Sequence, residues 1–296
     1  MRRPDLKTLQ LFIAVCEDGT LTGAARRENI AQSALSKRLV ELERTLGVEL
    51  LHRRATGMAV TPAGETLLHH ARRMLTNADN MSTELAEHAK GVRGFVRVLA
   101  NLSAIVEFLP EDLQSFLAAQ PAIRVQLEER PSLHVVAGIR DGAADFGICA
   151  GDTPTLDLES RTYRHDRLVI VMPTSHPLSG RAAVAFAEAL DYDHVGLHAE
   201  SSIYANLRAE AHRVGRPLRL RVHVPSFDAI CRMVQANMGL GVIPAPVYDL
   251  LGPPMHLTAV PLSDDWATRK LLVVTRRSPP APATRLLLDH LLSPKA

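Results

Sequence analysis

Residues 31–47 read AQSALSKRLVELERTLG and combine a buried helical stripe with a polar face. Leucines recur from Leu35 to Leu46 at spacings of 4, 3 and 4, and Gly47 follows the last of them. This pattern predicts one amphipathic helix that ends at a glycine. The opposite face starts with short hydrogen-bonding side chains and one cation: Gln32, Ser33, Ser36 and Lys37. Such a helix end fits the major groove of DNA, where these groups contact base edges and phosphates.

Shorter elements are expected on both sides of this helix. Apolar residues at helical spacing from 6 to 16 predict a first helix, and small residues after a turn signal at 18–19 predict a second. Val48–Leu51 and Met58–Thr61 are expected to form two short strands of a wing. The loop between the strands carries two arginines that would contact phosphates, Arg53 and Arg54.

Seven short motifs in this region carry a family resemblance. In chain order they are Leu9-x-x-Phe12, Leu21-Thr22-x-Ala24-Ala25, Gln32-Ser33-Ala34-Leu35-Ser36-Lys37, Leu42-Glu43, Leu46-Gly47-Val48, Leu51-x-Arg53 and Thr61-x-Ala63-Gly64. With them the chain resembles the LysR-type transcriptional regulators. The resemblance implies a winged helix-turn-helix DNA-binding domain over residues 1–61, with a recognition helix of about Gln32–Leu46. It also implies which side chains face DNA, with the last two in the wing: Gln32, Ser33, Ser36, Lys37, Arg53 and Arg54.

Three positions depart from the usual text of this family. Ala31 stands where a capping Ser or Thr is common, Lys37 replaces a more frequent Arg, and Leu51 replaces a usual Phe. A lost cap costs about 1 kcal/mol of helix stability. Lysine offers a point charge where arginine offers a bidentate fork. We therefore expect DNA binding to be retained and base preference to differ.

A long helix is expected from Thr61-Pro62, because a threonine cap precedes a proline and no further proline occurs before Pro110. An apolar heptad stripe runs along it: Leu67, Ala71, Met74, Ala78, Met81 and Leu85. The stripe could pack on its own domain. However, a helix of about 29 residues measures about 43 Å, longer than such a domain. Pairing with a second chain is therefore the favoured prediction for residues 62–91, and the resemblance implies the same linker and dimer.

Beyond Gly94 the sequence alternates between strands and helices. The expected strands are Phe95–Ala100, Ile123–Glu128, Phe146–Ala150, Leu168–Met172, Val195–His198, Leu220–Val224, Gly241–Ile243 and Leu271–Val274. The expected helices are Ile105–Ala119, Leu133–Arg140, Ile203–Val214, Asp228–Gln235, Pro246–Leu251 and Thr284–Leu292. Repeated strand–helix units predict a parallel sheet covered by helices.

Further motifs extend the resemblance to this part of the chain. They are Asp141-Gly142-x-x-Asp145-Phe146-Gly147-Ile148, Val169–Pro173 before His176-Pro177-Leu178, and Gly239-Leu240-Gly241-Val242-Ile243-Pro244. They are similar to the effector-binding domain of the same family. The resemblance implies a two-lobed α/β domain of the type 2 periplasmic-binding-protein-like fold over residues 92–296, so that the whole chain is a multi-domain α+β protein. Lobe I would hold about 92–162 and 267–296, and lobe II about 163–266.

Ligands of such sheets bind at the carboxyl ends of strands, where helix N-termini present unpaired N–H groups. This rule selects the effector-site residues: Asn101, Ser103, Arg130, Ser132, Cys149, Ser201, Ser202, Ser226 and Phe227. Each has a structural alternative, because Ser and Asn commonly cap helices and Cys fills cores. Serine-rich helix starts suit a carboxylate, whereas the nearby His198 and Glu200 suit a neutral or cationic group. The sequence therefore leaves the effector undecided.

Composition and motifs exclude several other classes. The 296 residues carry a formal charge of +2 and no apolar run of about 18 residues that could span a membrane. Ten Lys or Arg against seven Asp or Glu give residues 1–62 a modest basic excess. Three dispersed cysteines suit a reducing cytoplasm and predict neither a disulfide framework nor a metal site. No metalloprotease, hydrolase or P-loop motif occurs, so neither an enzyme nor a cofactor is expected.

The expected partners are promoter DNA, a small-molecule effector, RNA polymerase and further copies of the chain in a homodimer or homotetramer. Three alternatives stay open. The C-terminal domain could be a scaffold without an effector, or it could be a solute-binding module in its own right. A peroxide-sensing regulator would need paired reactive cysteines in lobe II, where the sequence places only Cys231.

Overall fold

The computed structural model describes residues 4–54, 57–89 and 94–293. The chain divides into one unit of Met1–Gly91 with Asp141–Ala143 and another of Val92–Arg140 with Ala144–Ala296. Each unit has its own apolar core, as expected for domains long enough to bury a core.

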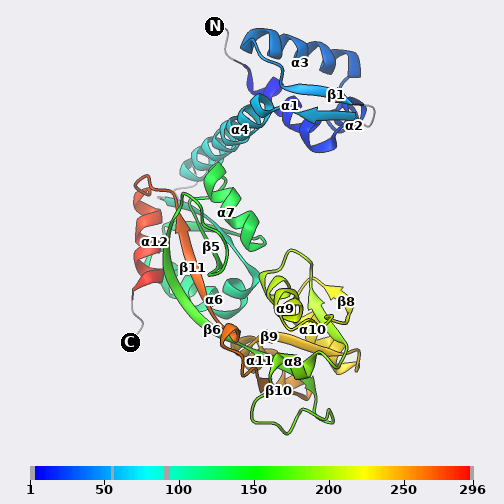
Figure 1. Ribbon diagram of the computed structural model, residues 1–296. Coiled ribbons are helices and arrows are strands. Elements are labelled where there is room, and N and C mark those ends of the chain that lie inside the picture. The colour runs from blue at the N-terminus through cyan, green and yellow to red at the C-terminus, as the bar shows by residue number, and fades with distance from the viewer. Residues whose placement is uncertain (1–3, 55–56, 90–93, 294–296) are drawn as a thin grey trace. The chain divides into compact units, whose positions relative to one another are not determined.

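Three helices form the body of the N-terminal unit (Figure 1). They are α1 (Leu6–Asp18), α2 (Leu21–Arg27) and α3 (Gln32–Leu46). The Asp5 carboxylate accepts a hydrogen bond from the first turn of α1, and the Thr20 hydroxyl does the same for α2, so side chains satisfy N–H groups that a helix leaves free. Gly47 ends α3 with a left-handed φ of 73°. The predicted extent of α3 is confirmed, with Leu35, Leu39 and Leu42 buried.

A two-stranded hairpin follows α3 and differs in register from the prediction. It consists of β1 (Leu51–Arg54) and β2 (Gly57–Val60), which pair antiparallel. The predicted first strand, Val48–Leu51, is wrong over most of its length. The Glu43 side chain accepts hydrogen bonds from the backbone N–H groups of Leu50 and Leu51, so this stretch bonds to α3 before strand pairing begins.

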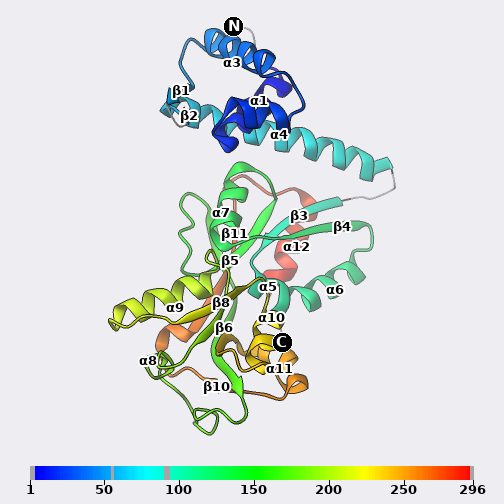
Figure 2. The same ribbon diagram turned by 90° about the vertical axis from the view of Figure 1, so that its right-hand side faces the viewer.

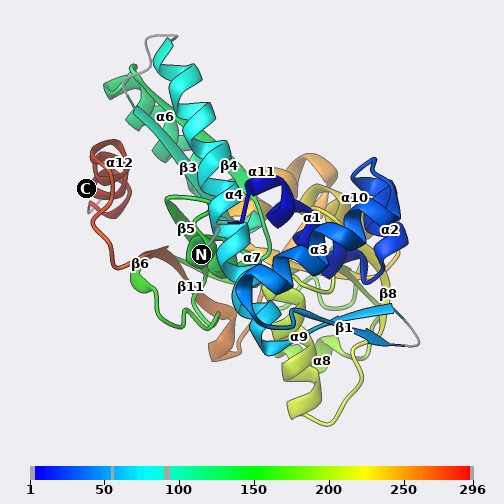
Figure 3. The same ribbon diagram turned by 90° about the horizontal axis from the view of Figure 1, so that it is seen from above.

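The long helix α4 (Pro62–Ala89) begins where the sequence predicts it. The Thr61 hydroxyl accepts a hydrogen bond from the backbone N–H of Gly64 at 2.9 Å and donates to the carbonyl of Glu49 at 2.8 Å. A Cβ at Gly64 would lie 2.2 Å from the carbonyl oxygen of Leu50, so glycine permits this close approach. Figures 2 and 3 show α4 continuing past the other elements of its unit.

The C-terminal unit is built on one mixed sheet, not on the parallel sheet that the sequence suggested. Its strand order is β4-β3-β5-β11-β6-β9-β7-β8, and β10 pairs with β6. The strands are β3 (Gly94–Ala100), β4 (Ile123–Glu129), β5 (Phe146–Ala150), β6 (Glu159–Pro173), β7 (His194–Leu197), β8 (Leu220–Val224), β9 (Leu240–Pro244), β10 (Leu257–Pro261) and β11 (Thr268–Thr275). Parallel pairs occur within each lobe, around β3 and around β7. All pairs made by β6 and β11 are antiparallel.

These two strands join the lobes. The chain leaves lobe I along β6 and returns to it along β11, so the two strands run in opposite directions side by side (Figure 1). The sequence predicted only Leu168–Met172 of β6, because that part is apolar and lies in the core of lobe II. The first part of β6, from Glu159 to Arg167, is mostly polar and carries no such signal.

Helices cover the sheet in both lobes. They are α5 (Leu102–Glu107), α6 (Leu109–Ala119), α7 (Ser132–Asp141), α8 (Phe186–Ala189), α9 (Ser202–Arg213), α10 (Phe227–Gln235), α11 (Ala245–Leu251) and α12 (Pro282–Leu292), with short turns η1 (Pro253–Met255) and η2 (Asp265–Ala267). The predicted single helix over Ile105–Ala119 is wrong. It breaks at Phe108, whose φ of −134° is not helical, because Pro110 has no N–H with which to continue the bonding of α5. The sequence also missed α8 and β10.

Among the described residues, no helix is both long enough and apolar enough to cross a bilayer.

Candidate functional site

The polar face of α3 is largely exposed to solvent. Gln32, Ser33 and Lys37 are exposed and Ser36 is half-buried. Val40, which is 59% exposed, continues the same face by one turn. The face therefore offers amide, hydroxyl and ammonium groups, with one apolar side chain that could meet a thymine methyl group.

The start of α3 lacks the usual cap. Ala31 makes no capping hydrogen bond, in agreement with the departure noted in the sequence. The hydroxyl of Thr22 on α2 donates to Oε1 of Gln32 at 3.2 Å. This contact leaves the amide N–H₂ group of Gln32 free to donate, which suits an acceptor on a base edge.

The wing places Arg53 opposite Met58 and Arg54 opposite Gly57 in the hairpin ladder. The side chain of Arg54 is exposed. The side chain of Arg53 lies outside the described residues, so its predicted phosphate contact stays a prediction. The N–H of Met58 donates to the carbonyl of Gly19 at 2.7 Å, which ties the wing to the turn between α1 and α2.

Glu43 positions the wing relative to α3, and its removal should be costly. Glu43→Ala removes the carboxylate that accepts from the N–H groups of Leu50 and Leu51, and both of these residues are buried. We expect the free energy of unfolding to fall by about 3 kcal/mol, at about 1–3 kcal/mol for each orphaned group. Urea unfolding followed by circular dichroism measures this change. The matched control is Glu41→Ala on the same helix, which loses an exposed ion pair with Arg44 and should change the free energy of unfolding little. Equal effects of the two substitutions would contradict this role.

The heptad stripe of α4 divides into two parts. Ala71 is buried, and Leu67 is half-buried against the N-terminal core. This part of the stripe packs on its own domain, which was the alternative to pairing with a second chain. Ala78 is half-buried, whereas Met74, Met81 and Leu85 are 53%, 58% and 62% exposed. Burying three such side chains favours association, so the distal half of the stripe is the part available for a second chain.

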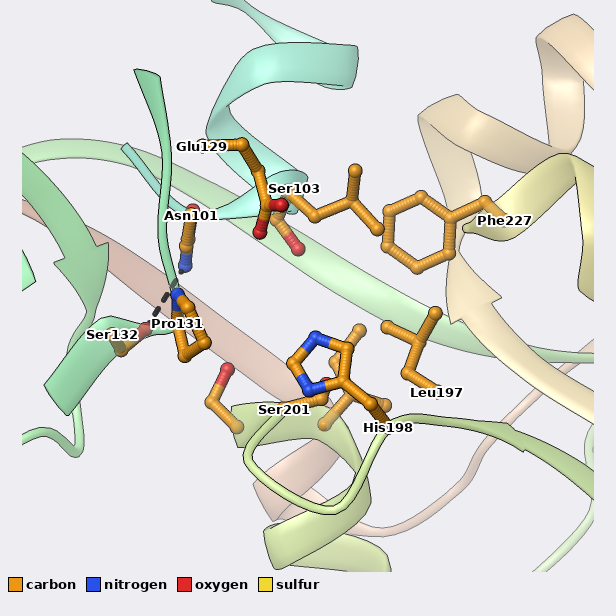
Figure 4. A pocket seen from close by; sticks show the side chains of 12 residues that line it. Asn101, Ser103, Glu129, Pro131, Ser132, Leu197, His198, Ser201 and Phe227 are labelled. Atoms are coloured by element: carbon orange, nitrogen blue, oxygen red, sulfur yellow. Dashed lines mark hydrogen bonds between the residues drawn. The ribbon is translucent and has the colours of Figure 1, made fainter. Parts of the chain in front are cut away.

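A narrow cleft with about 20 Å³ of free volume lies between the two lobes of the C-terminal unit. Six of the nine predicted effector residues line it: Asn101, Ser103, Ser132, Ser201, Ser202 and Phe227. They come from the starts of α5 and α7 in lobe I and of α9 and α10 in lobe II. Figure 4 shows side chains of both lobes pointing into the same space.

Three predicted residues do not line the cleft. Arg130 is exposed and pairs with Glu128. Cys149 is fully buried in a lobe I core cluster, and burial raises the pKa of its thiol to about 12. Ser226 precedes α10 and is half-buried. These residues do lie at strand ends or helix starts, as the strand-end rule requires. The rule does not say in which direction a side chain points, and these three side chains do not line the cleft.

The cleft also contains residues that the sequence did not select: Leu102, Glu129, Pro131, Leu197, His198 and Ile203. Four of them are next to a selected residue in the sequence, and the other two, Leu197 and His198, are next to each other. In the sequence analysis His198 was considered only for its effect on the charge of the ligand. The carboxylate of Glu129 and the ring of His198 enter the central space in Figure 4. Glu129 is the last residue of β4 and was missed because the predicted strand, Ile123–Glu128, ended one residue too early.

Hydrogen bonds fix the polarity of Ser132. Its hydroxyl oxygen accepts from the amide of Asn101 at 3.3 Å and from the N–H of Ala150 at 3.1 Å. Both acceptor positions of the hydroxyl are thereby used, so its hydrogen remains to be donated. The side-chain oxygen of Asn101 is occupied by the N–H of Ala104 at 3.0 Å. Lobe I therefore offers a hydrogen-bond donor to the cleft at Ser132.

Two family models match this chain. The model of the LysR substrate binding domain covers residues 89–294, and that of the lysR family of bacterial regulatory helix-turn-helix proteins covers residues 6–65. The chain belongs to the LysR family. LysR-family chains are transcriptional regulators that bind DNA through the helix-turn-helix domain, so the predicted family, fold class and DNA-binding function are confirmed at this level.

Full-length relatives support the same assignment for this LysR-family regulator. An uncharacterized HTH-type transcriptional regulator of Mycobacterium bovis, Mb2303c, is 29% identical over 318 residues, which cover 99% of this chain and 97% of that one. The crystal structure of CbnR in complex with its target DNA matches with a TM-score of 0.66 at 22% identity, covering 97% and 99% of the two chains. A cysteine-to-serine mutant of OxyR from Corynebacterium glutamicum, with H2O2 bound, matches with a TM-score of 0.59 at 25% identity, covering 98% and 91%.

Proposed function

We propose that this LysR-family regulator binds a specific promoter sequence and that a small molecule held between the two C-terminal lobes controls its activity. The observation that supports this most strongly is the inter-lobe cleft, which gathers polar side chains from three separate helix starts. Polar groups that converge on one cleft favour a ligand site over a purely structural role. A C-terminal domain that served only as a scaffold would have little use for them.

We infer from the lining of this cleft that the effector is a small acid that also carries a hydrogen-bond donor. Ser132 donates, and the N-termini of α7 and α9 favour negative charge. Glu129 presents an acceptor to the same space, which a hydroxyl or ammonium group of the ligand would satisfy. Phe227 supplies an apolar wall and is 2% exposed. These groups together favour a hydroxy or amino acid over a purely hydrophobic ligand.

We further propose a functional division at the expected boundaries. Residues 1–61 would hold Gln32, Ser33, Ser36 and Lys37 against bases, with Arg53 and Arg54 on phosphates. Residues 62–91 would pair two chains, and residues 92–296 would bind the effector and associate again into a tetramer. Such a regulator would act in the cytoplasm, where it meets promoter DNA and RNA polymerase. Neither a membrane nor a cofactor is part of this proposal.

Peroxide sensing by cysteine is the less favoured function for this chain, although one similar structure is an OxyR with H2O2 bound. All three cysteines are free thiols. Cys231 is fully buried in lobe II, and burial raises the pKa of its thiol to about 11. Burial likewise raises the pKa of Cys16 to about 12. Since the thiolate is the reactive form, these cysteines are poor peroxide targets at neutral pH.

A thermal-shift screen of small hydroxy and amino acids on the full chain tests the proposed control. A compound at 100 times its Kd should add about 2.7 kcal/mol to the free energy of unfolding. Ser132→Ala should abolish most of this gain, whereas Ser263→Ala, an exposed serine outside the cleft, should retain it. A stabilising compound that acts equally on both variants, or that leaves DNA binding unchanged, would contradict control through this cleft.

A further inference from the structure

A buried ion pair joins the two strands that connect the lobes. Asp166 on β6 and Arg269 on β11 are direct partners across the antiparallel ladder. Nε of Arg269 donates to Oδ1 of Asp166 at 2.9 Å, and Nη2 donates to Oδ2. The side chain of Asp166 is fully buried and that of Arg269 is 6% exposed. This two-point pairing in a buried place holds both strands in one geometry.

The same guanidinium reaches the effector cleft. Nη2 of Arg269 also donates to the hydroxyl of Ser103 at 3.2 Å, and Ser103 lines the cleft between the lobes. Ser103 lies in the first turn of α5, so one hydrogen bond separates a cleft residue from the hinge pair. The adjacent nitrogen, Nη1, is buried and has no hydrogen-bond partner among the residues that the structure describes. If the guanidinium loses Ser103, it keeps its two hydrogen bonds to Asp166, and Nη2 exchanges one acceptor for none.

A third charged group completes the cluster. The Glu107 side chain ends α5 beside the pair, with Oε1 at 3.9 Å from Nη2 of Arg269, and it is fully buried. Burial and the negative charge of Asp166 raise the pKa of Glu107 to about 9, against the opposing charge of Arg269. With Glu107 neutral, one guanidinium faces one carboxylate, and the buried cluster carries no net charge.

We propose that Arg269 couples the cleft hydroxyl of Ser103 to the two connecting strands, so that a ligand which recruits this hydroxyl loosens the Asp166–Arg269 pair and alters the hinge. The inference rests on the proposed effector site and adds the route by which its occupancy reaches the hinge. An under-satisfied guanidinium inside the protein is costly. The strands therefore readjust when Ser103 turns toward a ligand, and the lobes gain a second arrangement. A ligand can favour that arrangement only through such a difference in contacts.

Hydrogen exchange of the full chain, without DNA or ligand, tests this coupling. Ser103→Ala removes the hydroxyl as a ligand would. Amides of 164–168 and 268–271 should then exchange at least about tenfold faster, the factor that corresponds to about 1.4 kcal/mol. Ser202→Ala is the matched control, because Ser202 lines the same cleft from lobe II and should leave the exchange of these segments unchanged.

Ser103→Thr separates coupling from packing, since it keeps the hydroxyl and should restore wild-type exchange. Wild-type exchange in Ser103→Ala, or equally fast exchange in the Ala and Thr variants, would overturn the coupling. DNA binding of the same samples, measured by fluorescence anisotropy, distinguishes this failure from a failure of the proposed function. Suppose that the wild-type chain binds its upstream DNA specifically but that Ser103→Ala shows wild-type hydrogen exchange. The hinge inference is then wrong, whereas the proposed function stands.

Discussion

Replacing Gln32 and Lys37 together with alanine should weaken specific DNA binding about 100-fold and leave the fold intact. Both side chains are exposed on the free face of α3, so their loss creates no cavity. A good amide contact to a base is worth about 1–3 kcal/mol, and the lysine adds a phosphate contact. The salt dependence of binding should also flatten by about one phosphate contact per protomer. Anisotropy titrations at several salt concentrations measure both quantities.

Arg44→Ala is the matched control for this double variant. It removes a cation from the same helix, but near the C-terminal end, where Arg44 pairs with Glu41. We expect its affinity to stay within a few-fold of wild type. If Arg44→Ala weakened binding as much as the double variant, general charge rather than the predicted face would carry the interaction.

The second large effect concerns the exposed half of the α4 stripe. Met74→Asp combined with Met81→Asp would bury carboxylates at a chain–chain contact, at a cost of several kcal/mol. The double variant should therefore lose the contact between α4 helices, and light scattering should give about half the wild-type mass, because the C-terminal domains still pair two of the 32.4 kDa chains. Affinity for a two-half-site DNA should fall by about 100-fold or more, because the second half-site no longer gains from linkage.

The control is Arg73→Asp, which introduces the same residue at an exposed position next to Met74 but off the stripe. Its mass should equal that of the wild type. A wild-type chain that scatters as a monomer at micromolar concentration would exclude pairing through α4. A double variant that keeps the full wild-type mass would place the contact elsewhere.

The N-terminal unit could be predicted closely because its signals are local. Leucine spacing, the stop at Gly47 and the Thr61-Pro62 start each act within a few residues, and α3 and α4 begin where these signals stand. The wing register was missed because Glu43 bonds to Leu50 and Leu51 across seven and eight residues. A carboxylate that caps a strand start in this way has no distinctive spacing.

The C-terminal unit depends more on pairing between distant segments. Apolar runs in the sequence predicted most strand positions, but the polar half of β6 contains no such run. The antiparallel direction of β6 was also missed, because it depends on how the chain passes from one lobe to the other. The hinge cluster was also missed. Asp166 and Arg269 are 103 residues apart and Ser103 and Arg269 are 166 apart. The register of β6 and β11 brings the first two together, and the placement of α5 brings Ser103 to Arg269.

The residues of the effector cleft could be predicted from the sequence only in part. The rule that ligands bind at strand ends gathered six residues around one space. It could not tell that Cys149 faces a core or that Arg130 pairs with Glu128. The direction of a side chain depends on packing within the folded lobe, and a position at a strand end carries no information about that packing.

The most direct test of the central claim is a footprint of the full chain on the DNA upstream of its own gene. The account predicts protection of a partly palindromic site whose half-sites are spaced by whole helical turns of about 10–10.5 base pairs. Protection should weaken when Gln32 and Lys37 are replaced, and the protected length should change with a compound that stabilises the wild type but not Ser132→Ala. Protection no stronger than on shuffled DNA of the same composition would contradict the account.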